Sequence, residues 1–201
     1  VISKILMSRN IINSEDARRY LSPSLKDLHN PFLLRDMGKA VHRVIQAIHR
    51  KEKIVIFGDY DADGITSVAV LIRFLRDLAP GIDYYIPDRI EEGYGLNRDA
   101  IDDLKQRGTD LIITVDCGVS DLEDVQYATS LGLDTIILDH HEVPEKLPPA
   151  VAVINPHRRD CPFPFKDLAG VGIAFNFIIC LRGKLREAGF WNKRNYPNLK
   201  E

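Results

Sequence analysis

The chain has 201 residues, of which 45% are hydrophobic and 28% are charged, with a formal net charge of -2. This length suffices for one well-buried α/β domain with a small appendage at either end. The near-neutral charge excludes a strong basic field, so only local patches could bind nucleic acid. No apolar run approaches the roughly 20 residues of a membrane span, and the three cysteines lack metal or redox spacing. We also expect no signal peptide before the fold. We therefore expect a cytoplasmic chain with no membrane partner.

The chain divides into three predicted parts. Residues 1–36 hold short apolar fragments between polar turns, and we expect a lead-in packed on the main domain, with a helix starting near Asn13. Residues 37–165 form the predicted core. Residues 166–201 form a predicted helical tail, with its helix starting at about Asp167.

Strands and helices alternate through the core at the pitch of repeated βαβ units. The first predicted strand starts at Ile54. The other four span Ile82 to Ile86, Leu111 to Val115, Thr135 to Leu138 and Ala150 to Ile154. One predicted helix spans Lys39 to His49, and a second starts just after Gly64. A third has Asn97 as its N-cap and ends before Gly108. A fourth opens with a capping box of Ser120 and Glu123 and ends near Gly132. This alternation predicts an α/β fold with a mainly parallel, five-stranded sheet and helices on both faces.

Acids and imidazoles follow three of the predicted strands, and this is the most informative pattern in the chain. They are Asp59, Asp61 and Asp63 after the first strand, Asp116 after the third, and Asp139, His140 and His141 after the fourth. The carboxyl ends of parallel strands meet at one edge of the sheet, where such folds bind ligands. Crowded carboxylates need a counter-charge, and a mixed carboxylate and imidazole set suits Mn2+ or a similar ion. Two ions about 4 Å apart, sharing Asp116, would suit phosphoester hydrolysis.

Each of these features also has a structural explanation. A lone aspartate after a strand is usually a helix N-cap or a turn residue, and adjacent histidines are common on surfaces. Their joint occurrence on three strand ends favours a functional site. By contrast, His42, His49 and His157 stand alone and are interpreted as surface or packing residues. The segment Gly170-Val171-Gly172 is only a fragment of a dinucleotide fingerprint, so we assign it to close packing or phosphate approach.

Four motifs carry a resemblance to a known family. They are Gly58-Asp59-Tyr60-Asp61-Ala62-Asp63-Gly64, Glu92-Gly93-Tyr94-Gly95-Leu96, Asp116-Cys117-Gly118 and Asp139-His140-His141. The sequence resembles the DHH phosphoesterase superfamily and, within it, the RecJ family of single-strand-specific 5′ to 3′ DNA exonucleases of bacteria. The resemblance implies a Rossmann-like DHH domain that binds Mn2+ or Mg2+, with two ions in the complete enzyme. It also implies single-stranded DNA as substrate in repair and recombination, with a single-strand-binding protein and a helicase as partners.

The resemblance assigns roles to individual residues. It makes Asp61, Asp63, Asp116 and His140 metal ligands, with Asp116 bridging, and it adds Asp59 as a further ligand. It makes His141 the catalytic residue that contacts the scissile phosphate, and Asp139 the residue that orients the imidazoles. Arg89 and Tyr94 are predicted substrate contacts. Arg98 could contact phosphate in the same region or be a solvated surface charge. The tail residues Lys184, Arg186, Lys193 and Arg194 are interpreted as solvated surface charges, with phosphate contact as the alternative.

The sequence departs from the family pattern in two respects. Phe57 stands where many members carry a histidine, and no aspartate between Leu168 and Glu201 matches the family's fourth motif. We therefore expect the N-terminal catalytic domain of a longer enzyme, weakly active or inactive alone. Two other functions stay open: a phosphodiesterase acting on short oligonucleotides, cyclic dinucleotides or pyrophosphate, and a non-catalytic scaffold in replication.

Overall fold

A computed structural model describes residues 1–191 of the chain, which fall into two compact units. The first unit, residues 1–30, contains helices α1 (Ile2–Ser8) and α2 (Ser14–Leu21) and a short 3-10 helix at Leu25–Asp27. The predicted cap of α2 is confirmed, since the Asn13 side chain accepts a hydrogen bond from the Asp16 N–H at 2.8 Å. Helix α1 was not expected from the sequence. The packing of the lead-in on the main domain stays a prediction.

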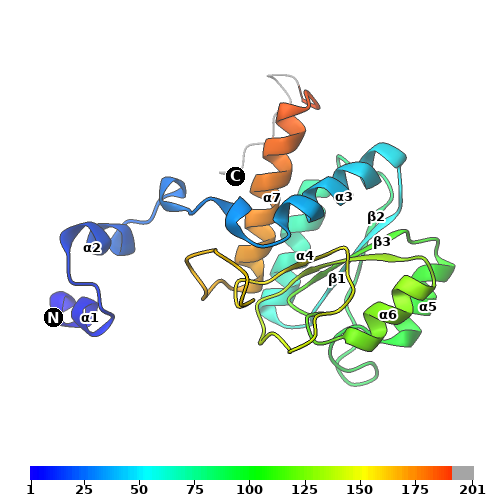
Figure 1. Ribbon diagram of the computed structural model, residues 1–201, viewed down its shortest axis with the longest axis horizontal. Coiled ribbons are helices and arrows are strands. Elements are labelled where there is room, and N and C mark those ends of the chain that lie inside the picture. Colours follow the sequence, from blue (N-terminus) through cyan, green and yellow to red (C-terminus); the bar gives the residue numbers. More distant parts are fainter. Residues whose placement is uncertain (192–201) are drawn as a thin grey trace. The chain divides into compact units, whose positions relative to one another are not determined.

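The second unit, from Pro31 onward, is built on a five-stranded sheet with the order β2-β1-β3-β4-β5 (Figure 1). The strands are β1 (Ile54–Gly58), β2 (Ile82–Tyr85), β3 (Leu111–Val115), β4 (Asp134–Leu138) and β5 (Ala152–Ile154). All four pairings between neighbouring strands are parallel. Strands β1 and β3 are buried along their whole length, as continuous β-branched runs predict.

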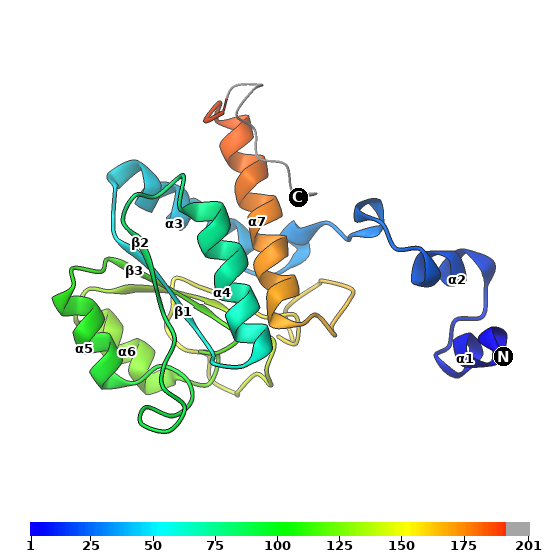
Figure 2. The same ribbon diagram turned by 180° about the vertical axis from the view of Figure 1, so that it is seen from behind.

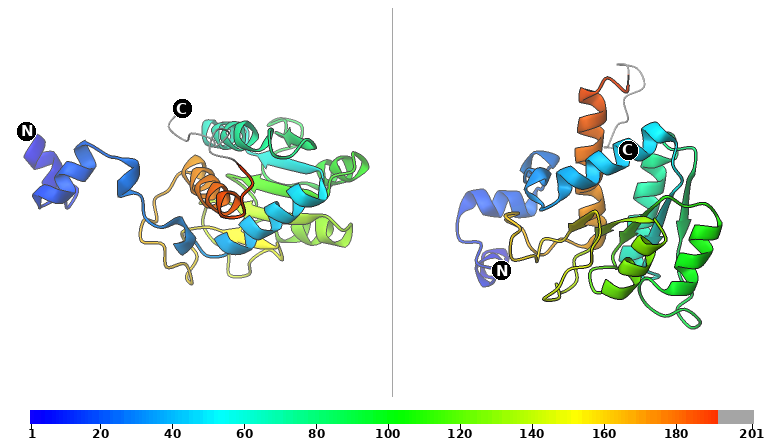
Figure 3. Two further views of the ribbon diagram at one scale, coloured as in Figure 1. Left: turned by 90° about the horizontal axis from the view of Figure 1, so that it is seen from above. Right: turned by 45° about the vertical axis from the view of Figure 1, so that its right-hand side comes forward.

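Helices cover both faces of this sheet (Figures 1 and 3). The helices of the second unit are α3 (Met37–Arg50), α4 (Ala62–Leu75), α5 (Arg98–Gln106), α6 (Leu122–Ser130) and α7 (Gly170–Glu187), with a 3-10 helix at Pro31–Leu33. One core lies between the sheet and α3, α4 and α7, and a second lies between the sheet and α5 and α6. The predicted fold class is therefore confirmed.

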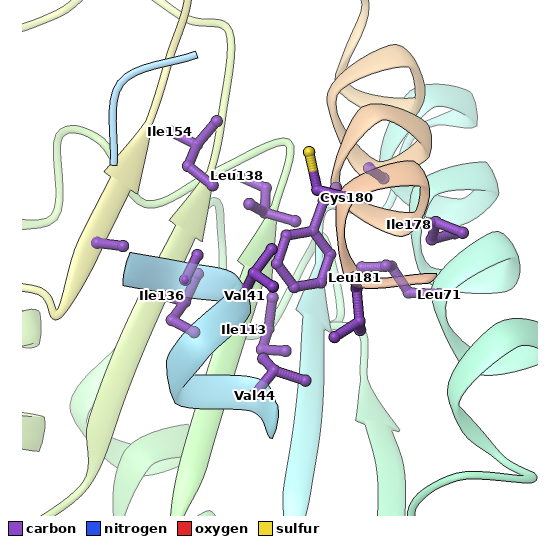
Figure 4. Packing of buried hydrophobic residues seen from close by; sticks show 14 of the residues in the cluster. Val41, Val44, Leu71, Ile113, Ile136, Leu138, Ile154, Ile178, Cys180 and Leu181 are labelled. Carbon is purple, nitrogen blue, oxygen red and sulfur yellow. The ribbon is translucent and has the colours of Figure 1, made fainter. Parts of the chain in front are cut away.

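The larger core shows why these segments become helices. Helix α3 turns Val41 and Val44, three residues apart, toward the sheet, where Figure 4 shows them near Ile113 and Ile136. Helix α7 is apolar over most of its length because it packs on both the sheet and α4, beside which it runs (Figure 2). None of the helices within residues 1–191 has the length and apolar character needed to cross a bilayer.

Four predicted helix starts differ from the structure, and the first is that of α3, which begins at Met37 and not at Lys39. Helix α4 begins at Ala62, before Gly64, because the Asp61 side chain caps it. Helix α6 has Asp121 as its N-cap residue without a side-chain capping bond, so the capping box of Ser120 and Glu123 does not form. Helix α7 starts at Gly170, because its N-cap residue Ala169 has an extended backbone and Asp167 lies in the irregular segment before it. Strand β5 is also shorter than predicted, beginning at Ala152.

Candidate metal centre

The sheet register explains why the candidate side chains meet. The last residues of four neighbouring strands are paired side by side. They are Gly58 of β1, Val115 of β3, Leu138 of β4 and Ile154 of β5. The residues that follow these four partners are Asp59, Asp116, Asp139 and Asn155. Four neighbouring strands thus end on a polar residue in one row, at the carboxyl edge of the sheet.

The turn after β1 brings further carboxylates to this row. Asp61 caps helix α4 by accepting hydrogen bonds from the N–H groups of Asp63 at 2.8 Å and Gly64 at 3.0 Å. The turn is tight, since a Cβ on Gly64 would lie 2.4 Å from the Asp59 carbonyl oxygen. The pKa of the Asp61 carboxyl is lowered, mainly by the hydrogen bond from the Gly64 N–H. Burial acts in the opposite direction and is the smaller effect. Burial instead raises the pKa of Asp59.

Asp116 is the central acid of the row. Its backbone lies in the left-handed region with φ of 61°, and its residue surface is only 1% exposed. Its Oδ1 atom lies 3.0 Å from Nε2 of His140, but the contact lacks hydrogen-bond geometry, so this buried oxygen has no hydrogen-bond donor. Burial, and then the charges of Asp63 and Asp61, raise the pKa of Asp116 to about 8. A positive charge placed at the free oxygen would stabilise the ionised form of this acid.

The pair of histidines after β4 is held by Asp139. This buried carboxylate accepts hydrogen bonds from the N–H groups of Val119, His140 and His141, and from Nδ1 of His141 at 2.7 Å. The last of these bonds raises the pKa of His141 to about 9. Burial opposes ionisation of Asp139, but the bonds from His141 and Val119 hold its pKa below the usual range. Since Nδ1 of His141 is occupied, its Nε2 atom is left for a ligand.

Two overlapping groups of side chains could hold cations at this edge. The ligand atoms of Asp59, Asp61 and Asp116 lie within 4.8 Å of one another, as do those of Asp116, His140 and His141. Asp116 belongs to both groups. Asp63 lies beside the second group, with its Oδ2 atom 3.6 Å from Nε2 of His140. Carboxylates plus imidazole, with an unpaired buried oxygen in the middle, fit Mn2+ or Mg2+.

The predicted substrate residues lie around this edge. The Tyr94 hydroxyl donates to the Asp116 carbonyl oxygen at 3.1 Å and lies 3.3 Å from Nδ1 of His141. A cleft of about 260 Å3 is lined by Tyr94, His141 and the loop from Gly118 to Ser120. The Arg89 guanidinium carbon lies 5.3 Å from the centroid of the Tyr60 ring.

Of the other cations and histidines singled out in the sequence, none of those within residues 1–191 makes one of these contacts. Arg98 stacks on the Tyr127 ring at 5.2 Å, and Lys184 forms an ion pair with Glu187 at 2.7 Å. Arg186 lies in the last turn of α7. Lys193 and Arg194 lie outside the described residues. The three isolated histidines are His42 and His49 on α3 and His157 in the loop after β5.

Two features of the site were not found in the sequence. Asn155 is fully buried, and its side chain donates to the His141 carbonyl oxygen at 2.9 Å while accepting from the His157 N–H at 2.8 Å. The sequence could have indicated this residue, because Asn155 is a polar residue directly after the fifth predicted strand. The second feature is the start of α7, where the N–H groups of Gly170 and Val171 donate to the Asp63 carboxylate. These donors are backbone N–H groups, which every residue except proline carries, so the residue types in the sequence do not indicate them.

Comparisons with known proteins show the family of this chain. A profile of the DHH family, N-terminal domain, matches residues 53–197. The chain is 44% identical over 185 residues to the single-stranded-DNA-specific exonuclease RecJ of Bacillus subtilis, covering 92% of this chain and 24% of that protein. It is 40% identical over 204 residues to the protein of that name from Escherichia coli, covering 100% of this chain and 35% of that protein. The crystal structure of exonuclease RecJ bound to manganese superposes with a TM-score of 0.69 at 31% identity, covering 76% of this chain and 38% of that chain.

These matches confirm the resemblance expected from the motifs. The chain spans only 24% to 35% of the length of the two RecJ proteins, so it is similar to one part of them. The family profile covers well over half of the chain, including all the acids and imidazoles of the row. The chain belongs to the DHH family, and its residues 53–197 correspond to that family's N-terminal domain.

Proposed function

We propose that the protein containing this chain is a metal-dependent, single-strand-specific 5′ to 3′ exodeoxyribonuclease, and that this chain supplies its N-terminal catalytic domain. The observation that carries the proposal is the state of Asp116: a buried acid, shared by two groups of ligand atoms, with an oxygen that no donor satisfies. The similarity to single-stranded-DNA-specific RecJ exonucleases supports the choice of substrate.

The acids and one imidazole of the row would hold the cations. We assign Asp59, Asp61, Asp63, Asp116 and His140 as ligands of Mn2+ or Mg2+, with Asp116 shared between two ions, because their donor atoms converge on the same edge. When bound, such ions neutralise charge on phosphoryl oxygens and lower the pKa of water. The left-handed backbone at Asp116 is the kind of strained conformation that functional sites retain.

His141 is the proposed catalytic residue of the chain itself. Its bond to Asp139 keeps the ring protonated around neutral pH, so its Nε2–H can donate to a phosphate in the adjoining cleft. Asp139 fixes the orientation of this ring, and Asn155 fixes the backbone that carries it. A protonated His141 would therefore stabilise the negative charge that develops at phosphorus.

Arg89 and Tyr94 are the proposed contacts to the DNA strand. Both belong to the loop between β2 and α5, and Tyr94 is about half exposed while its hydroxyl is bound at the site. An exposed aromatic ring is a surface on which a base can stack, and a guanidinium can pair with a phosphate. As further parts of the proposal, the protein acts in the cytoplasm, and a single-strand-binding protein and a helicase are its partners.

The proposal is tested with the full-length protein, Mn2+, and 5′-labelled or 3′-labelled single strands. We expect mononucleotide release from the 5′ end, little cleavage of blunt duplex, and loss of at least about 100-fold in kcat for His141→Gln with unchanged Mn2+ affinity. His49→Gln, on α3, is the matched control and should behave as wild type. Preferential turnover of dinucleotides would favour the short-oligonucleotide alternative, and Mn2+ binding without hydrolysis would favour the scaffold.

A further inference from the structure

The N-terminus of helix α7 is bonded to the candidate metal centre. The Gly170 N–H donates to Oδ2 of Asp63 at 2.6 Å, and the Val171 N–H donates to Oδ1 of the same carboxylate at 2.8 Å. The first N–H groups of a helix have no partners within the helix, and its dipole favours a negative charge there. No side chain caps α7 at Ala169, so the Asp63 carboxylate serves as its cap from a different element.

Gly170 also leaves room for the central acid. A Cβ atom at this position would lie 2.7 Å from Oδ1 of Asp116 and 3.1 Å from its Cγ atom. Asp116 cannot move away cheaply, since it is buried and its backbone is fixed between β3 and β4. The backbone of Gly170 does not have a positive φ, so an alanine there would be opposed by its contact with Asp116 and not by backbone conformation.

We propose that Gly170 and Val171 are positioning residues of the metal centre. Their N–H groups set the rotamer of Asp63 by occupying one lone pair on each oxygen, which leaves the remaining lone pairs for a cation. The bare Cα of Gly170 lets Asp116 lie beside this carboxylate. Helix α7 therefore forms one wall of the centre, which the acids and imidazoles of the strand ends complete. This inference rests on the proposed function.

The steric part is tested by Gly170→Ala in the full-length protein. The matched control is Gly183→Ala, in the same helix, where a Cβ would meet nothing within 4 Å. Gly170→Ala should raise the Kd for Mn2+, measured by the electron paramagnetic resonance of free Mn2+, by about tenfold or more, while Gly183→Ala should leave it unchanged. Far-ultraviolet circular dichroism without metal should be the same for both variants.

The hydrogen-bond part is tested by Val171→Pro against Val171→Ala. Proline in the first turn of a helix removes one N–H without breaking an intrahelical bond, whereas alanine keeps the donor and removes only the side chain. Val171→Pro loses the hydrogen bond to the charged Asp63 carboxylate and should bind Mn2+ about tenfold more weakly, whereas Val171→Ala should bind it as wild type does. Its exonuclease activity should recover when the Mn2+ concentration is raised, because affinity and not folding is affected.

The outcomes separate the two proposals. Wild-type protein that binds no Mn2+ overturns the proposed metal centre and the positioning role with it. Wild-type protein that binds Mn2+, with Gly170→Ala and Val171→Pro matching their controls, overturns the positioning role alone. If both variants unfold, a third variant, Asp63→Asn, provides the test: it keeps one acceptor oxygen for α7, and it loses the second acceptor together with the charge. If Asp63→Asn is folded and binds Mn2+ as wild type does, Asp63 is not a ligand and the inference is wrong.

Discussion

Asp116 combines three costs that a structural residue would avoid. Its φ of 61° is unfavourable for a residue with a Cβ, its carboxyl is buried, and one of its oxygens has no donor. The two nearby charges of Asp61 and Asp63 add repulsion. A divalent cation bound by this carboxylate would satisfy the free oxygen and offset the burial and the repulsion, so the proposed function accounts for a strained backbone at this position.

A first prediction follows for the metal-free protein. The pKa of Asp116 is about 8 when folded and about 3.9 in an unfolded chain, so its ionisation destabilises the folded state increasingly as the pH rises from 4 to 8. Asp116→Asn removes that ionisation, and asparagine tolerates the left-handed backbone. We therefore expect the variant to have a higher Tm than wild type at pH 9 in EDTA, and a difference that shrinks toward pH 4. Calorimetry at several pH values measures this.

The same substitution should abolish nuclease activity and Mn2+ binding. Added Mn2+ should then raise the Tm of wild type only, because a cation stabilises the state that binds it. Equal stabilisation of Asp116→Asn by Mn2+ would place the cation elsewhere.

A second prediction concerns the imidazole of His141. Its bond to Asp139 is the main reason that its pKa rises to about 9. In Asp139→Asn this anionic partner is lost, so the pKa of His141 should fall toward the ordinary value of about 6.5. The measurement is a titration of the histidine Cε1–H resonances by NMR in the metal-free protein, with His141→Gln used to assign the signal. A signal that titrates near 9 in both proteins would show that Asp139 does not control His141.

At the scale of elements, Asp61 has two roles that can be separated. It caps helix α4 through the N–H groups of Asp63 and Gly64, and it is a proposed metal ligand. Asparagine is as good a cap as aspartate, whereas alanine is not. Asp61→Asn should therefore lose Mn2+ affinity while keeping its stability, and Asp61→Ala should lose both, with about 1 kcal/mol of unfolding free energy. Urea unfolding and Mn2+ titration of the two variants provide the comparison.

A purely structural Asp61 would give a different result. In that case Asp61→Asn would bind Mn2+ as tightly as wild type, and only Asp61→Ala would change.

The row of acids was predictable because its signals are local. Each β-branched run in β1, β3 and β4 ends on an acid, and parallel pairing brings those ends together whatever the details of the loops. The order of the strands was not needed for this inference, since every parallel strand ends at the same edge.

The parts that sequence did not predict depend on contacts between distant segments. Ser120 and Glu123 have the spacing of a capping box, but the helix starts at Leu122, and the Asp121 carboxylate accepts from the Leu96 N–H at 2.7 Å instead. That bond fixes the loop that carries Tyr94. The bonds from Gly170 and Val171 to Asp63 likewise join segments about one hundred residues apart, and their donors are backbone groups.

At the scale of the second unit, a partly buried ion pair links its start to the connection between β5 and α7. Arg158 donates to Asp36 at 2.6 Å, to the Val153 carbonyl oxygen and to Asp160. Burial opposes ionisation of Asp36, but hydrogen bonds from Lys39 and Arg158 hold its pKa below the usual value. The charge of Asp36 therefore stabilises the folded chain.

A fourth prediction gives this pair a pH dependence. Because the pKa of Asp36 is lower in the folded than in the unfolded chain, its stabilising effect is present above pH 4 and is lost as the pH falls through the folded pKa. Asp36→Asn, which suits the left-handed φ of 63°, should be less stable than wild type at pH 7. Urea unfolding at a series of pH values should show the difference shrinking in acid. A constant difference would mean that charge is not the cause.

In the proposed function, the strand ends of one sheet edge hold divalent cations around Asp116. Anomalous diffraction at the manganese absorption edge, from crystals of the full-length protein grown with Mn2+, tests it most directly. We predict anomalous peaks on both sides of the Asp116 carboxylate, one toward Asp59 and Asp61 and one toward His140, and their loss in Asp116→Asn. Mn2+ peaks that lie away from Asp116, or their absence from wild-type crystals at saturating Mn2+, would contradict the account.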